Sequence, residues 1–104
     1  MNKTARYELL MLEGLSLYKK GSKSSLWDAI EFFSKASMVN QEDGLASYWI
    51  AKSYEKKDNK DYDLIIEAYE DSLNKILPED LRLDAQASKE AAYKNKKTFD
   101  NFWK

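Results

Sequence analysis

The sequence predicts an all-α fold of about five helices. One Pro and three Gly in 104 residues leave few helix breakers. Apolar residues recur at spacings of three and four along most of the chain, and no segment alternates in the manner of a β-strand. A chain of this length fits one domain, so we expect residues 1–104 to form a single unit.

The first three helices are predicted from their apolar stripes and from the residues that end them. Gly21 is expected to end the first helix, because glycine readily adopts the left-handed conformation that closes helices. Ser25 is expected to cap the second helix, after a short polar loop. Asn40 or Asp43 is the expected cap of the third helix.

The last two helices are separated by the single proline, Pro78. The fourth helix has the clearest apolar stripe, which continues to Leu77, so the helix is expected to end at Pro78. The final helix, about 79–103, begins with Glu79 and Asp80, whose negative charges favour a helix N-terminus. Its stripe consists mostly of small residues, which predicts close packing against a neighbouring helix.

An internal repeat is the strongest signal of organisation. Gly14 corresponds to Ala51 at an offset of 37 positions, and Phe33 corresponds to Tyr69 at an offset of 36. A period near 36 residues in helix pairs is typical of a helical solenoid, in which stacked hairpins share one core. The expected boundaries are about 5–39 for repeat 1, about 43–77 for repeat 2 and about 79–103 for a capping helix.

The repeated pattern places a small residue and a large apolar residue on the first helix. Small, aromatic and small residues then follow on the second helix. The residues that carry it are Gly14, Leu17, Gly21, Ala29, Phe33, Ala36, Ala51, Tyr54, Tyr62, Ile65, Tyr69 and Ser72. This pattern resembles the tetratricopeptide repeat family, and the longer period is similar to its Sel1-like variant. The resemblance implies an α-α superhelix of two hairpins plus a C-terminal cap.

The same resemblance implies a groove that is lined by the first helix of each repeat and takes an extended or helical peptide. By register, the groove residues are Glu8, Met11, Tyr18, Lys19, Tyr48, Lys52 and Glu55. Met and Tyr would supply adaptable apolar contacts, whereas Lys and Glu would steer a partner by charge.

Composition argues against several classes of function. The chain has no Cys and no His, so it lacks thiolate nucleophiles and the commonest general base and metal ligand. We expect no catalytic site, no metal and no cofactor. The net charge of -1 disfavours a nucleic-acid binder. No apolar run approaches the ~18–20 residues of a membrane span, so we expect a cytoplasmic protein without a membrane partner.

The leading hypothesis is a non-enzymatic module that binds a peptide or helix of another protein. An alternative is a structural subunit, or a secretion-type chaperone, held in an obligate complex by its aromatic C-terminal helix. Phe99, Phe102 and Trp103 would then form a patch for self-association or for a partner. A nucleic-acid-associated factor is the third and least favoured hypothesis, because basic and aromatic residues alternate near the C-terminus.

Overall fold

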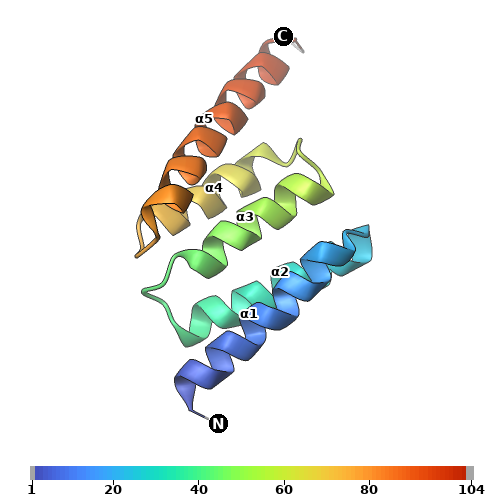
Figure 1. Cartoon of the computed structure of the whole chain (residues 1–104). Coiled ribbons are helices and arrows are strands. Elements are labelled where there is room, and N and C mark those ends of the chain that lie inside the picture. Colours follow the sequence, from blue (N-terminus) through green and yellow to red (C-terminus); the bar gives the residue numbers. More distant parts are fainter. Residues whose placement is uncertain (1, 103–104) are drawn as a thin grey trace.

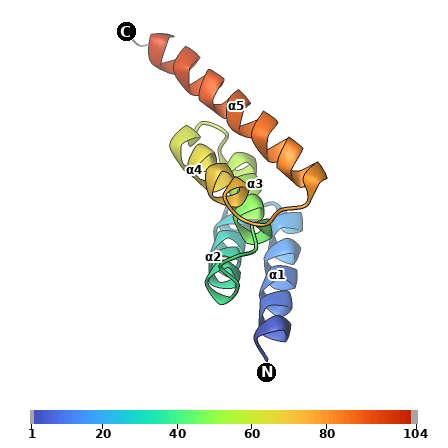
Figure 2. The same cartoon turned by 90° about the vertical axis from the view of Figure 1, so that its left-hand side faces the viewer.

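The all-α prediction is confirmed by the computed structural model, which describes residues 2–102. Within that range the chain forms five α-helices, and each helix packs against the next one in sequence (Figure 1). Helix α1 lies on one side of α2, and α5 runs obliquely across the end of the molecule formed by α3 and α4 (Figure 2). The bounds are α1 Lys3–Lys20, α2 Lys23–Val39, α3 Leu45–Lys57, α4 Tyr62–Leu73 and α5 Glu79–Phe102.

The break between α1 and α2 is tighter than the sequence suggested. Gly21 ends α1 in the left-handed conformation, with φ of 74°, as expected. The cap of α2 is Ser22 and not Ser25, because Ser22 has the extended backbone of a cap. Its hydroxyl oxygen accepts a hydrogen bond from the Ser25 backbone N–H at 3.1 Å. The predicted loop is therefore mostly the first turn of α2.

Helix α4 ends at Leu73, well before the predicted end at Pro78. The chain between these residues turns back and pairs with the segment that precedes α3. The Ile76 N–H donates to the Glu42 carbonyl at 2.9 Å, and the Gly44 N–H donates to the Ile76 carbonyl at 2.7 Å. The expected helical stripe therefore breaks at its end, and the side chain of Ile76 is exposed.

Two clusters of buried side chains form the core. The first lies mainly between α1 and α2 and includes Phe33, which is fully buried against Gly14. A Cβ atom at Gly14 would lie 2.5 Å from the Phe33 ring, so only glycine allows this approach. The second cluster joins α3, α4 and α5 around Tyr69. Trp49 packs against both clusters and links them.

Helix α5 runs obliquely to the other helices, and its C-terminal part extends beyond them (Figures 1 and 2). Ala85 and Ala92 are its buried residues, which matches the small-residue stripe seen in the sequence. Its first turns are held by Arg82, whose guanidinium donates to the carbonyls of Leu73 and Lys75, both at 3.0 Å. These carbonyls lie at and just beyond the end of α4, where helical partners run out.

Candidate interaction surfaces

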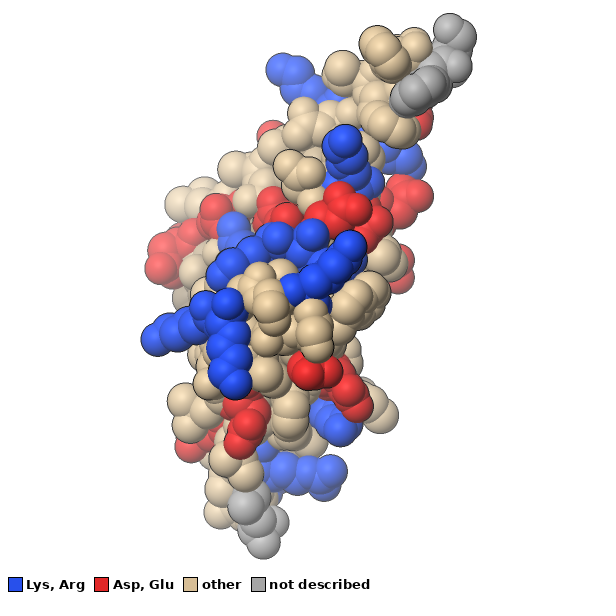
Figure 3. Space-filling view, turned by 90° about the vertical axis from the view of Figure 1, so that its right-hand side faces the viewer, with Lys and Arg blue, Asp and Glu red and all other residues tan. Residues whose placement is uncertain are grey.

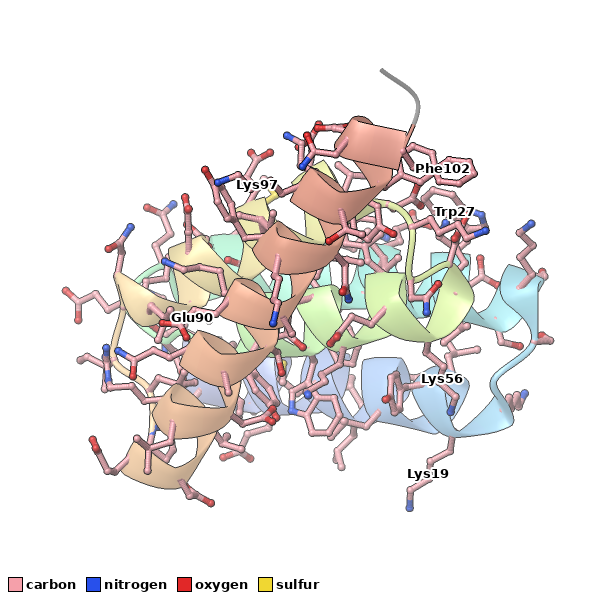
Figure 4. All side chains as sticks on the ribbon, turned by 90° about the horizontal axis from the view of Figure 1, so that it is seen from above. Lys19, Trp27, Lys56, Glu90, Lys97 and Phe102 are labelled. Atoms are coloured by element: carbon pink, nitrogen blue, oxygen red, sulfur yellow. The ribbon has the colours of Figure 1, made fainter. Side chains whose placement is uncertain are left out.

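The carboxyl ends of α1 and α3 meet through Lys56. Its ammonium donates to the Tyr18 carbonyl at 3.0 Å and lies 4.3 Å from the centre of the Tyr18 ring. The same ring packs edge-on against Trp49, with 5.3 Å between ring centres. Figure 4 shows Lys56 near α1 and Lys19 pointing from α1 into solvent. Two predicted groove residues, Tyr18 and Lys19, therefore lie at an open junction between the two helices.

Lysines concentrate at this junction. Lys19 and Lys20 occupy the last turn of α1, and Lys56 lies in the last turn of α3. The side chain of the next residue, Lys57, is only 5% exposed and pairs with Asp61, so it is not part of this surface. Figure 3 shows Lys and Arg side chains gathered across the middle of this face, with acidic side chains above and below. Cations at helix carboxyl ends are stabilised by the helix dipole, so these lysines also have a structural reason to be there. We call this surface the lysine edge.

Three other predicted groove residues form a polar cluster with α4 and α5. The Lys52 ammonium lies 2.6 Å from the Asp84 carboxylate and 3.9 Å from Glu55. The Tyr48 hydroxyl donates to Asp84 at 2.5 Å, and the Tyr69 hydroxyl donates to Glu55. The cluster thus joins the three consecutive helices α3, α4 and α5.

The charges of this cluster support one another. Hydrogen bonds from Lys52 and from Tyr48 hold the pKa of Asp84 below its usual value. Burial raises the pKa of Tyr69, and the hydrogen bond to Glu55 raises it further. The cluster thus places Lys52 between Asp84 and Glu55, with the hydroxyls of Tyr48 and Tyr69 as donors. Such paired groups stabilise a structure only when each of them keeps its partner.

We expect Asp84→Asn to lower the free energy of unfolding at pH 7 by about 1 kcal/mol. The effect is modest because the Asp84 side chain is 43% exposed and solvent screens its charge. A lowered folded-state pKa stabilises the protein above the unfolded pKa of about 3.9, and this stability is lost as pH falls through the folded pKa. Urea unfolding of both proteins from pH 7 to pH 2 should show the gap closing below about pH 4.

The control for this prediction is Asp28→Asn, which changes an exposed carboxylate on α2. That substitution should leave the pH dependence nearly unchanged. An equal stability gap for Asp84→Asn at pH 7 and pH 2 would show that its charge is not what holds the cluster together.

The remaining predicted residues are dispersed. Glu8 is exposed on α1, far along the helix from the lysine edge, whereas Met11 is buried in the core between α1 and α2. On α5, the Phe99 ring lies 6.1 Å from that of Tyr62, and Phe102 is 77% exposed. Trp103 lies outside the described residues. Phe99 and Phe102 are three residues apart on α5, so they lie on the same side of that helix.

Two adjoining hollows along α3 were missed by the sequence analysis: one lies between α3 and α4, and the other is lined by α2, α3 and α4. Their volumes are about 420 and 410 Å³, and they share Ser47, Ile50 and Asp71. Ser47 donates to Asp71, which also pairs with Lys75 at 2.9 Å. Burial opposes ionisation of Asp71, but the hydrogen bonds from Ser47 and Lys75 outweigh it and lower the pKa. No pattern in the sequence pairs Ser47 with Asp71, because their contact depends on how α3 packs against α4.

Neither metal ligands nor a membrane span is evident in the part of the chain that the structure describes. Within residues 2–102, no three acidic side chains come together in a way that could hold a metal ion. No helix in the same range is long and apolar enough to cross a bilayer.

No protein-family model, curated protein or solved structure was found to match this chain. The class of protein is therefore defined by the fold itself, an all-α chain in which five helices pack in sequential order.

Proposed function

We propose that this protein is a non-enzymatic interaction module built as a two-repeat, tetratricopeptide-like solenoid with α5 as its cap. The support is that equivalent positions of the two repeats have equivalent environments. Phe33 and Tyr69 are both fully buried, and Gly14 and Ala51 are both buried beside them. Shared burial at an offset of 36 or 37 positions is what stacked repeats require.

The proposed binding surface is the face of α1 and α3 at the lysine edge. The observation that carries this proposal is the junction of Tyr18, Lys56 and Trp49, beside the exposed Lys19. Aromatic rings beside ammonium groups combine apolar contact with attraction for carboxylates. The favoured partner is therefore an acidic segment of another protein, with Tyr48, Lys52 and Glu55 holding the adjoining part of the face in shape.

A selection from a random peptide library, displayed on phage, tests this proposal with a defined probe. We expect the enriched peptides to be rich in Asp and Glu, and to bind more weakly as salt rises. The double variant Lys19→Glu/Lys56→Glu should weaken their binding at least tenfold, because two attractive charges become repulsive.

The matched control is Lys35→Glu, because Lys35 is exposed on α2 and pairs with Glu31 at 3.4 Å. This variant should bind the selected peptides as tightly as the unmodified protein. Selected peptides without acidic enrichment, or equal binding by the double variant, would refute the lysine edge as the binding surface.

The two hollows along α3 are the second candidate surface for the same function. They are favoured by their combined extent and by the apolar side chains of Ile50 and Leu64 that line them. Leu64 is exposed on α4, so Leu64→Glu should be tolerated by the fold. If Leu64→Glu abolishes peptide binding and the double lysine variant does not, the peptide site lies in the hollow between α3 and α4.

A further inference from the structure

Helix α5 leaves an open hollow on the side where it meets α4. The hollow has a volume of about 520 Å³, and its apolar lining comes from Ile66 of α4 and Tyr93 of α5. Tyr93 is 62% exposed. Two acidic and three basic side chains surround these two residues: Glu70, Glu90, Lys89, Lys94 and Lys97. An exposed aromatic ring within a charged rim is typical of a protein interface.

Glu90 and Lys97 lie equally far along α5 from the Tyr93–Lys94 pair, one on each side of it. Glu90 and Lys97 are seven residues apart, which is close to two helical turns, so they lie on one side of the helix. Figure 4 shows both side chains on the same side of α5, with Phe102 on the other side. Tyr93 and Lys94 lie midway between them.

This arrangement is self-complementary when two α5 helices run antiparallel. A two-fold axis that passes between Tyr93 and Lys94 places Glu90 of one chain opposite Lys97 of a second chain. The same axis generates the reciprocal pair, as a two-fold interface requires. A partner with charges of a single sign would instead place like charges beside either Glu90 or Lys97.

We propose that a second copy of this chain occupies the hollow, and that α5 is the surface of an antiparallel homodimer. Tyr93 of each copy enters the hollow beside Ile66 of the other, and two Glu90–Lys97 pairs close the rim. The length of α5 suits this role, because its 24 residues extend about 36 Å. The projecting C-terminal part of each α5 then packs against α5 of the other copy. This inference is independent of the peptide-binding surface proposed above.

Sedimentation equilibrium with the full chain tests the proposal. With rising concentration, the mass of the unmodified protein should approach twice 12.1 kDa. Glu90→Lys and Lys97→Glu should each weaken dimerisation at least tenfold, since each substitution creates two like-charge contacts across the axis. Circular dichroism should show unchanged helix content, because both residues are exposed on α5.

Restoring complementarity gives the sharper test. The double variant Glu90→Lys/Lys97→Glu should dimerise again, because both pairs reappear with reversed sign. An equimolar mixture of the two single variants should form heterodimers, although each variant alone stays monomeric. The controls are Glu13→Lys and Lys3→Glu, which make the same charge changes at exposed sites on α1, outside the lysine edge.

Three results would overturn the proposal. One is a monomeric unmodified protein at every concentration up to about 1 mM. A second is a dimer that both single charge reversals leave intact. The third is a mixture of single variants that remains monomeric, which would exclude the antiparallel pairing of Glu90 with Lys97.

Discussion

Replacing Phe33 with alanine is expected to lower the free energy of unfolding by about 3–5 kcal/mol. The Phe33 ring is fully buried between α1 and α2 and lies directly against Gly14. Removing the ring loses the free energy gained by burying it, and leaves a cavity that the surrounding helices cannot fully close. For a domain of this size, each kcal/mol corresponds to roughly 4–8 °C in Tm. Thermal and urea unfolding followed by circular dichroism measure the loss.

The neighbouring residue provides the matched control. Phe32 is partly exposed, and the Lys35 ammonium lies 5.6 Å from the centre of its ring. Phe32→Ala should therefore cost clearly less than Phe33→Ala. A double-mutant cycle with Gly14→Ala adds a second check. The methyl group added at Gly14 clashes with the Phe33 ring, but it fits the space that opens when Phe33 is also replaced by alanine. Similar losses for Phe32→Ala and Phe33→Ala would contradict this account of the core.

Gly44→Ala is expected to lower the free energy of unfolding by about 1–3 kcal/mol. The backbone at Gly44 has φ of -83° and ψ of -5°, which alanine adopts without strain. On conformational grounds alone, alanine would stabilise the protein by ~0.4–1 kcal/mol. The added Cβ, however, would lie 2.5 Å from the Ser72 carbonyl oxygen and 3.1 Å from that of Ile76. These are backbone atoms, so the steric cost dominates.

Gln41→Ala is the control for this prediction, because Gln41 is exposed in the same connection between α2 and α3. The unfolding free energy of the Gln41→Ala variant should lie within about 0.5 kcal/mol of that of the unmodified protein. A Gly44→Ala protein as stable as Gln41→Ala would show that the connection moves away from α4 at little cost.

The sequence predicted the position of some candidate residues along their helices, but it did not predict which of these residues contact one another. Lys19 was expected at the end of the first helix, and it is exposed there. Tyr48 and Lys52 were placed in a groove by register alone. The structure brings both of them to Asp84, which is more than 30 positions later in the chain. Sequence spacing carries no information about which helix crosses their face, and hence about their partner.

The sequence by itself determined the helical class, the approximate number of helices, the break at Gly21 and the start of the last helix after Pro78. These features follow from local physics, because periodicity, caps and backbone preferences act within a few residues. Only the tertiary structure decided that α4 ends at Leu73 and that Gly44 must be glycine. Both depend on one pairing, between the segment before α3 and the segment after α4. That pairing forms when the helices pack, and no local signal in either segment specifies it.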